Sequence, residues 1–198
     1  MNPILLDISM PIKTSRLLLR PPIPGDGAEL NAAIIESFPE LHAWMPWAVE
    51  KPTLSDSEEN VRRAHADWIL RKDLRILIFD QASGKLAGST GLHRINWSVP
   101  SFEMGYWART SFAGLGIITE AANALTRFAF TELKAKRVEI RCNPENVRSM
   151  AVIKRLGYEF EGYLRQNELG TGASGALRDT LIFSRIGADG LPELEVSW

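Results

Sequence analysis

Two glycines that lie one residue apart, directly before an apolar helical segment, have the type and spacing that point most clearly to chemistry. They are Gly114 and Gly116, in the stretch 103–121, and a helix is expected to begin near Ile117. Such a loop gathers backbone N–H groups at a helix N-terminus, where unpaired amides and the positive end of the helix dipole favour phosphate. The spacing predicts an anionic, nucleotide-bearing ligand, although a tight strand-to-helix turn without a ligand has the same spacing.

Two common phosphate-binding motifs do not fit this loop. A P-loop requires Gly-x-x-x-x-Gly-Lys-Ser/Thr, which the chain lacks, and the dinucleotide fingerprint requires a third glycine where this chain has Thr119. A Rossmann domain also alternates strands and helices from its beginning, whereas this loop follows a fourth strand. A dinucleotide-binding domain is therefore disfavoured.

The cysteine and histidine content indicates neither a thiol centre nor a metal centre. Cys142 is the single cysteine and lies in the strand-like run RVEIRC, where a buried, inert thiol is expected. His42, His65 and His93 are far apart, and none has a partner at metal-ligand spacing. We expect no metal.

The N-terminal half must supply the first strands and a helical layer. A strand is expected at 16–20, followed by a helix over 27–37 that Asp26 caps. The aromatic segment 38–47 reads as irregular, and an amphipathic helix follows from Ser55 or Asp56 to about Lys72.

The remaining elements begin as an antiparallel meander of strands and continue with helices interspersed among the strands. Strands are expected at 75–80, 85–95 and 102–109, with turns at Ser83-Gly84 and 96–100. After them we expect a helix over 117–133, a strand at 137–142, a helix over 146–156 closed by Gly157, and strands at 158–166 and 177–186. The class is α+β with a mixed sheet.

Composition limits the class of protein. The chain has 198 residues, is 45% apolar and 24% charged, and contains no linker-like stretch, so we expect one domain over 1–198. A net charge of −1 provides no electrostatic basis for nucleic-acid binding, and no apolar run has membrane-spanning length. The N-terminus does not read as a secretory signal, which makes the cytoplasm the expected location.

Four stretches together resemble one family. They are TSRLLLRPPIPGDGAEL (14–30), FEMGYWARTSFAGLGIITEA (102–121), CNPENVRSMAVIKRLGYEFEG (142–162) and LRDTLIFSRI (177–186). They resemble the Gcn5-related N-acetyltransferases (GNAT), and within them the RimJ/RimL-like branch. The resemblance covers 14–186 and leaves 187–198 as a tail. It implies acetyl-CoA as cofactor and a central sheet of about seven strands, splayed between the fourth (102–109) and fifth (137–142).

The resemblance also implies a cofactor site. In the family, main-chain amides of the glycine loop wrap the pyrophosphate, which here assigns that role to Ala113, Gly114, Leu115, Gly116 and Ile117. Ser111 departs from the family's long first side chain, so a long side chain over the phosphates is absent unless nearby Arg109 substitutes for it. Thr119 is placed to add a hydroxyl.

In the same family the pantetheine arm lies in the gap between the splayed strands. This places it along the backbone of Tyr106, Trp107 and Ala108, with Asn146 in contact and Lys154 near the 3′-phosphate or the ribose. For Asn146 helix capping is the alternative, and for Lys154 a solvated basic face.

The resemblance implies three catalytic candidates. Ser149, in Asn-x-x-Ser, is expected to approach the CoA sulfur and stabilise or protonate the thiolate, and an outward-facing serine is the alternative. Glu103 is the candidate base, acting through water or by orienting the amine, with an ordinary surface carboxylate as the alternative. Tyr106 is a third candidate, for which packing is the competing role.

The acceptor is the least determined part of the reaction. At pH 7 an α-amine with a pKa of about 7.8 is roughly one-seventh neutral, whereas a lysine near 10.4 is neutral in fewer than about one molecule in a thousand. A distant glutamate as base therefore favours a peptide α-amine. The resemblance places Trp44 and Trp47 on the substrate side, where they and Glu103 would line the acceptor groove, with core packing as the alternative for the tryptophans. A small-molecule acetyltransferase and a non-catalytic CoA-binding module stay open as alternatives, as do monomer and homodimer.

Overall fold

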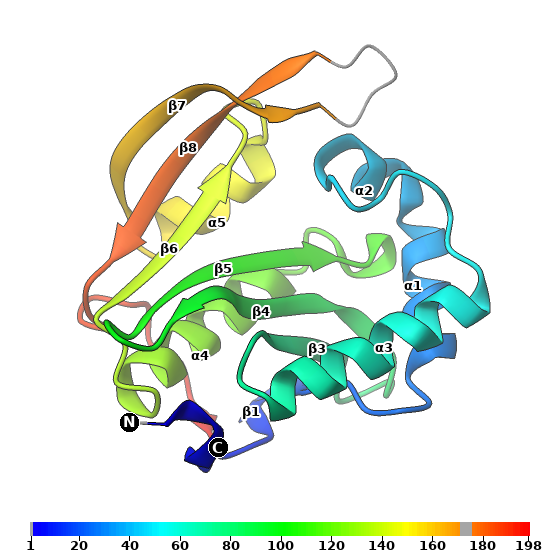
Figure 1. Ribbon diagram of the computed structural model, residues 1–198, viewed down its shortest axis with the longest axis horizontal. Helices are drawn as coiled ribbons and strands as arrows, with labels where there is room; N and C mark the ends of the chain where they lie inside the picture. The colour runs from blue at the N-terminus through cyan, green and yellow to red at the C-terminus, as the bar shows by residue number, and fades with distance from the viewer. Residues whose placement is uncertain (1, 171–175) are drawn as a thin grey trace.

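A nine-stranded mixed sheet runs through the centre of the molecule (Figure 1). The structure is a computed structural model and describes residues 2–170 and 176–198. The strands are β1 (Ile12–Thr14), β2 (Leu17–Arg20), β3 (Leu74–Asp80), β4 (Leu86–Asn96), β5 (Ser101–Ala108), β6 (Arg137–Cys142), β7 (Glu159–Leu169), β8 (Leu177–Arg185) and β9 (Val196–Ser197). Their order in space is β7-β8-β6-β5-β4-β3-β2-β1-β9.

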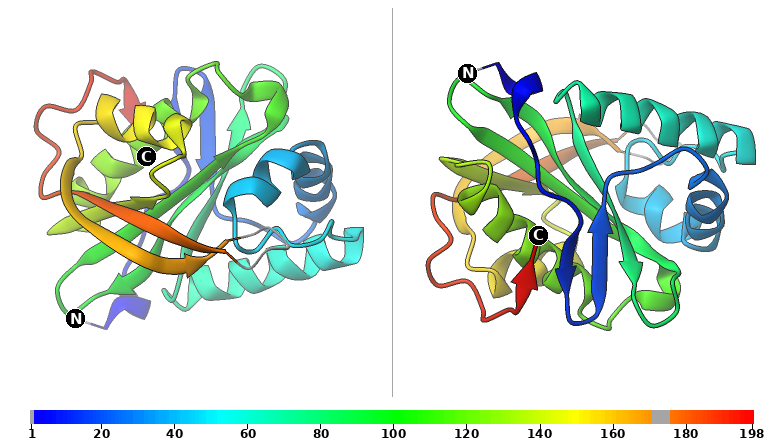
Figure 2. Two further views of the ribbon diagram at one scale, coloured as in Figure 1. Left: turned by 90° about the horizontal axis from the view of Figure 1, so that it is seen from above. Right: turned by 90° about the horizontal axis from the view of Figure 1, so that it is seen from below.

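Helices cover both faces of this sheet (Figure 2). They are α1 (Gly27–Glu36), α2 (Phe38–Trp44), α3 (Leu54–Ile69), α4 (Ile117–Thr131) and α5 (Val147–Arg155), with short 3-10 turns η1 (Pro3–Leu5) and η2 (Thr110–Phe112). α4 and α5 lie on one face and enclose the larger core, which includes Phe102, Met104 and Phe128. α1 and α3 lie on the opposite face, over a smaller cluster around Leu77 and Leu86. The expected α+β class with a mixed sheet is confirmed.

The sheet opens between β5 and β6, as expected. The two strands pair in parallel only from Ser101–Glu103 to Arg137–Glu139, and beyond these residues they separate (Figure 1). Among the described residues, no strand therefore pairs with the far end of β5 on its β6 side. This separation creates the gap around which the site is built.

Two short strands extend the sheet beyond the expected seven. β1 makes a hairpin with β2, and β9 pairs with β1 through Thr14 and Val196. Next to β9, Trp198 packs edge-on against Phe128 of α4, with ring centroids 5.4 Å apart. The tail thus closes one edge of the sheet. Neither strand was expected, because two or three residues carry no periodic signal.

Three local expectations in the helical layer were wrong. Asp26 makes no side-chain cap on α1, because its carboxylate holds the Arg20 guanidinium through two bonds of 2.7 Å. The segment expected to be irregular forms α2, in whose first turn Pro39 is tolerated. α3 begins earlier than expected, because Thr53 makes a reciprocal capping box with Asp56.

Candidate active site

The glycine loop presents a set of free amides. Gly114 and Gly116 have φ values of +80° and +79°, a left-handed conformation that glycine adopts without strain. Within the described residues, the Ala113 N–H bonds the Thr110 carbonyl oxygen, whereas the amides from Gly114 to Thr119 have no hydrogen-bond partner. The loop therefore offers its donors from Gly114 onward, at the N-terminus of α4. These residues fit an anionic phosphate group.

Arg109 holds the loop rather than facing it. Its Nε donates to Glu36 at 2.6 Å and its Nη1 to Glu29 at 2.9 Å, and its side chain is only 13% exposed. The Ser111 N–H also donates to Glu36, at 2.8 Å. Both carboxylates belong to α1 and occupy the Arg109 guanidinium, an arrangement that does not favour Arg109 as a replacement for the missing side chain over the phosphates. Arg109, Ser111 and Glu36 together form what we call the loop latch.

The Glu36 carboxylate of the loop latch is stabilised in its ionised form by the groups around it. The pKa of Glu36 falls from 4.5 to about 2, chiefly because the Ser111 side chain donates a hydrogen bond to it and because Arg109 stabilises its charge. Glu36 thus stays ionised and keeps the loop against α1. Ser111, the residue that departs from the family pattern, takes part in this contact.

A second contact supports the loop from the other side, and sequence reasoning missed it. Arg16, in the turn between β1 and β2, donates to the Leu115 carbonyl oxygen at 3.1 Å and to Glu120 at 2.5 Å. Thr14 bonds the other oxygen of Glu120 at 2.5 Å. Because Glu120 lies in the first turn of α4, its charge would oppose an anion there, and Arg16 balances it.

The α5 side of the gap carries a hydroxyl pair. Tyr106 of β5 places its hydroxyl 2.9 Å from Ser149 Oγ on α5. Ser149 sits there because Asn146 caps the helix, accepting the Ser149 N–H at 3.0 Å, so the capping role of Asn146 is confirmed. Burial raises the pKa of Tyr106, so its phenol keeps its proton. Two of the expected catalytic residues are thus brought together in one hydrogen bond.

Cys142 lies beside this pair and is buried, as expected. Burial raises the pKa of its thiol to about 11, despite a contact with Ser149 that acts in the opposite direction. A thiol of this kind is a weak nucleophile at neutral pH.

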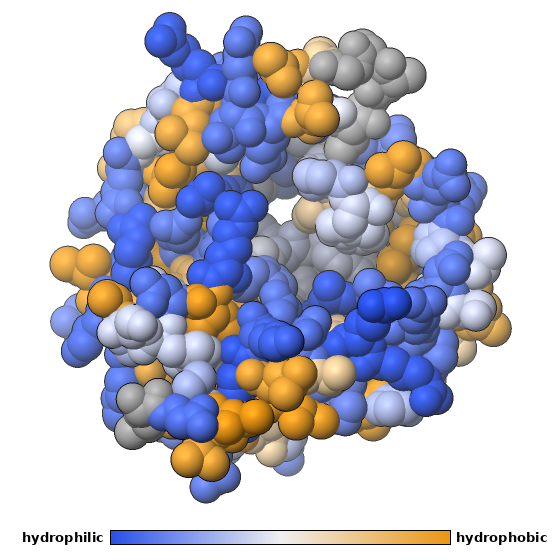
Figure 3. Space-filling view, viewed as in Figure 1, coloured by the Kyte–Doolittle hydropathy of each residue, from blue (hydrophilic) through white to orange (hydrophobic). Residues whose placement is uncertain are grey.

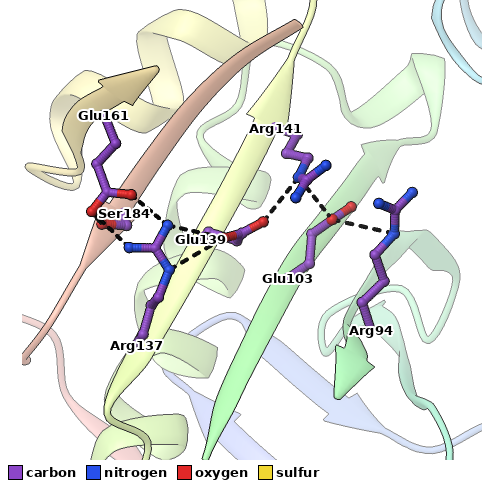
Figure 4. A network of polar contacts seen from close by, with 7 residues as sticks. All are labelled: Arg94, Glu103, Arg137, Glu139, Arg141, Glu161 and Ser184. Carbon is purple, nitrogen blue, oxygen red and sulfur yellow. Dashed lines mark hydrogen bonds and ion pairs between the residues drawn. The ribbon is translucent and has the colours of Figure 1, made fainter. Parts of the chain in front are cut away.

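Glu103 faces the opposite side of β5, within a row of alternating charges across the sheet (Figure 4). Its Oε2 lies 3.2 Å from Arg141 Nε and 3.4 Å from Arg94 Nε, in ion-pair range but without hydrogen-bond geometry. The row continues through Glu139 and Arg137 to Glu161. Glu103 is a partly buried carboxylate flanked by two guanidinium groups, and not an ordinary surface residue.

A hydrogen bond between a histidine and a carboxylate lies next to Glu103, and the sequence analysis did not predict it. His93 of β4 is the register partner of Glu103, and its Nδ1 lies 2.6 Å from Asp73 Oδ2. The sequence contained no signal for it, because the two residues are twenty positions apart and only the pairing of β3 with β4 brings them together.

Aromatic residues border the open side of the site. Trp44 and Asn146 line a pocket of about 380 Å³ between α2 and the start of α5. Trp47 is 52% exposed, with its ring centroid 6.4 Å from that of Trp107. Figure 3 shows this face of the molecule hollowed at its centre, with mostly hydrophilic residues around the hollow. Arg178 of β8 reaches across to α2, donating to the Ala43 carbonyl oxygen at 2.8 Å.

The other expected cofactor residues remain predictions. Thr119 lies in the first turn of α4, half-buried, and Lys154 is exposed in the last turn of α5. Trp107 and Ala108 lie on β5 beyond the point where β6 separates. In the described ranges, 2–170 and 176–198, no cluster of His, Cys, Asp or Glu could hold a metal ion, and none of the helices is long and apolar enough to cross a membrane.

Comparison with known proteins assigns this arrangement to a family. A family model described as the acetyltransferase (GNAT) domain matches residues 16–159. The chain belongs to the GNAT acetyltransferase family. Two similar proteins are the putative ribosomal N-acetyltransferase YdaF of Bacillus subtilis and the ribosomal-protein-serine acetyltransferase of Escherichia coli. The first is 35% identical over 147 residues, 72% of this chain and 77% of the relative. The second is 28% identical over 147 residues, 72% of this chain and 79% of the relative.

Solved GNAT structures share the fold. The microcin C7 self-immunity acetyltransferase MccE, in complex with acetyl-CoA and AMP, has a TM-score of 0.79 at 26% identity, covering 87% of this chain and 93% of that one. RimL, the ribosomal L7/L12 α-N-protein acetyltransferase in complex with CoA, has a TM-score of 0.81 at 22% identity, covering 92% and 98%. The RimJ/RimL-like resemblance is confirmed, and the protein is an N-acetyltransferase with acetyl-CoA as donor.

Proposed function

We propose that this GNAT enzyme transfers the acetyl group directly to an α-amine, favouring a protein or peptide N-terminus, while acetyl-CoA and acceptor are bound together. The observation that supports the proposal is that the candidate catalytic groups lie on the two opposite faces of β5. The Tyr106–Ser149 hydroxyl pair lies on one face, and Glu103 lies on the other.

The residues present fit the donor. The loop amides from Gly114 onward would hold the pyrophosphate, the free edge of β5 near Trp107 and Ala108 would pair with the pantetheine arm, and Asn146 would lie beside that arm. When bound, acetyl-CoA supplies an acyl group activated as a thioester. A backbone N–H of β5 near Trp107 would donate to the carbonyl oxygen as charge develops on it.

Each protein group then has a stated task. Glu103 orients the incoming ammonium, and Ser149 donates a proton to the departing sulfur with Tyr106 supporting its hydroxyl. A C–N bond forms and a C–S bond breaks. The ammonium loses two protons in all, one delivered to the sulfur and one passed to solvent.

Direct transfer is favoured over an acetylated enzyme by the state of Cys142. This thiol is buried and its pKa is raised to about 11, so it supplies little thiolate for a covalent intermediate. Initial rates measured against both substrates test this step. Intersecting reciprocal plots are expected, and parallel plots with an isolable acetyl-enzyme would contradict direct transfer.

Acceptor choice is tested by a panel. The names of the relatives from Bacillus subtilis and Escherichia coli concern ribosomal proteins, and the Escherichia coli name specifies serine. We therefore expect hexapeptides with free N-terminal serine or alanine to be acetylated faster than an N-blocked lysine peptide or spermidine. A preference for spermidine or for a free amino acid would favour the small-molecule alternative.

Replacing the hydroxyls tests the catalytic assignment. Ser149→Ala and Tyr106→Phe should each lower kcat more than they change the affinity for acetyl-CoA, because the hydroxyl pair acts on the reacting end. Stabilisation by acetyl-CoA in thermal unfolding should persist in both variants. A protein that acetyl-CoA stabilises but that acetylates nothing in the panel would favour the CoA-binding module.

A further inference from the structure

We propose that His93, oriented by Asp73, is the general base that deprotonates the acceptor amine. The inference rests on the proposed function and deepens it, by assigning the proton-accepting step to a residue other than Glu103.

The strand register places the imidazole beside the acceptor side of the gap. His93 pairs with Glu103 across β4 and β5, and residues directly opposite in an antiparallel pair share one face of the sheet. The next pair on that face is Gly91 with Gly105, and Gly105 directly precedes Tyr106. The ring therefore lies at the beginning of the separated part of β5, on the face away from α5.

Two paired glycines make room for the ring. A methyl group on Gly91 would lie 2.7 Å from His93 Cε1 and 2.9 Å from Nε2, and one on Gly105 would lie 3.4 Å from Nε2. The imidazole thus lies over two positions that have no side chains. Any larger residue at 91 would force it to move, so its orientation is built into the sheet.

Asp73 decides which nitrogen is free. Its Oδ2 lies 2.6 Å from His93 Nδ1, and a carboxylate can only accept, so Nδ1 carries the hydrogen. In the neutral ring this leaves the Nε2 lone pair available to accept a proton, while Asp73 keeps its contact with Nδ1. A carboxylate, a histidine and a proton donor in this order form a recurrent device for general base catalysis.

Glu103 is less suited to accept the proton. Its Oε2 already lies 3.4 Å from Arg94 Nε and 3.2 Å from Arg141 Nε, so two guanidinium groups occupy the space around that oxygen. It keeps the task of orienting the ammonium. The two residues thus divide the work, Glu103 attracting the cation and His93 removing its proton.

The charges around the imidazole come from three neighbouring segments. Asp73 precedes β3, Glu103 lies on β5, and Arg94 follows His93 on β4. Arg75 of β3 is turned toward α3, where its Nη1 bonds Asn60 at 2.5 Å. Among these groups, the Asp73 carboxylate is the one in hydrogen-bond contact with the ring.

The proton balance is simple. The acceptor R–NH₃⁺ gives one proton to Nε2 and becomes R–NH₂, whose lone pair forms the C–N bond. As the C–S bond breaks, Ser149 gives its proton to the departing sulfur, and the second proton that leaves the nitrogen replaces it on the Ser149 hydroxyl. His93 returns its proton to solvent through its exposed side, which is 29% accessible.

The pH dependence of His93→Gln tests the proposal. With acetyl-CoA and the N-terminal serine hexapeptide, we expect kcat/KM to fall about 100-fold or more at pH 7, the scale of general base catalysis. The deficit should narrow to within about threefold at pH 9.5, where an α-amine of pKa about 7.8 is already neutral. A deficit that is equal at both pH values would overturn the proposal, since a merely structural role has no reason to follow the protonation of the amine.

Matched variants separate the roles. His65→Gln, which removes a ring bonded to the Pro22 carbonyl oxygen, should leave kcat/KM within about twofold. Glu103→Gln should raise KM for the peptide at both pH values. If Glu103→Gln and not His93→Gln showed the pH-dependent deficit, Glu103 would be the base.

An independent readout distinguishes failure of this step from failure of the proposed function. In ¹⁵N-labelled protein above pH 8, the His93 ring should show hydrogen on Nδ1 and a bare Nε2, and Asp73→Asn should change that pattern. Hydrogen on Nε2 would overturn the assignment. If no acceptor in the panel is acetylated, the proposed function fails. The ring measurement still decides whether Asp73 holds the hydrogen on Nδ1 and leaves Nε2 of His93 able to accept a proton.

Discussion

Neutralising Glu36 should loosen the loop latch and expose how much it stabilises the protein. Glu36→Gln keeps the size of the side chain but removes the charge that Arg109 and the Ser111 N–H contact at 2.6 and 2.8 Å. A fall in pKa from 4.5 to about 2 corresponds to at most about 3 kcal/mol of stabilisation. Because 33% of the side chain is exposed, solvent screening reduces this to about 1–2 kcal/mol.

The pH dependence has a definite sign. The folded-state pKa of Glu36 lies below its unfolded value, so its contribution is fully present above about pH 4.5 and disappears as the pH falls through about 2. Urea unfolding of Glu36→Gln and of the parent protein from pH 7.5 down to pH 3 measures this contribution. The difference in unfolding free energy should stay constant from pH 7.5 to about pH 5 and shrink from there toward pH 3.

A matched control removes a carboxylate of similar type from an exposed pair. Glu59 is 61% exposed and contacts Arg63 one turn along α3, so Glu59→Gln should change stability by less than about 0.5 kcal/mol. Glu36→Gln should also weaken stabilisation by acetyl-CoA, because the loop that follows Ser111 loses its anchor to α1. A Glu36 effect that is constant with pH, or no larger than that of Glu59, would refute the reasoning.

Three further predictions concern the loop and the tail. Gly116→Val should reduce acetyl-CoA affinity at least about tenfold in calorimetry, because a β-branched residue is strained at φ +79°, and unchanged affinity would make the loop only a turn. Arg16→Met should raise KM for acetyl-CoA several-fold with kcat within about twofold, since it removes the donor to Leu115; a selective loss of kcat would assign Arg16 elsewhere. Trp198→Ala should lower unfolding free energy by about 1–2 kcal/mol through its lost contact with Phe128, and an unaltered urea midpoint would show that the tail does not hold the edge of the sheet.

Local signals carried most of the fold. The alternation of Phe102 and Met104 with polar neighbours located β5, and the glycine pair located the start of α4 because left-handed positions are strongly selective for glycine. The Asn146-x-x-Ser149 spacing located both a helix cap and a hydroxyl. These features depend on residues within one or two turns of each other, so a single sequence is enough to read them.

Contacts between residues that are far apart in the sequence could not be predicted in this way. The contacts of Arg109 are with two carboxylates of α1 that lie more than seventy positions away in the sequence. The two residues of β9 form a strand only through their pairing with β1, so their own sequence could not predict it. Asp26 looked like a helix cap because its spacing fits one, yet Arg20 offered its carboxylate two charged donors. Sequence spacing indicates which hydrogen-bond partners a side chain could have. Only the folded structure shows which of those partners are close enough to bond it.

The sequence by itself determined an anion-binding loop before a helix, because glycine conformation, helix dipole and capping are local physics, and four of its stretches showed the resemblance to the GNAT acetyltransferases. The tertiary structure decided how charge is arranged around the acceptor. Strand register set Glu103 between two arginines and laid His93 over two glycines against Asp73. Electrostatic interactions depend on distance in space, and a register shift of one residue would turn these side chains to the other face of the sheet.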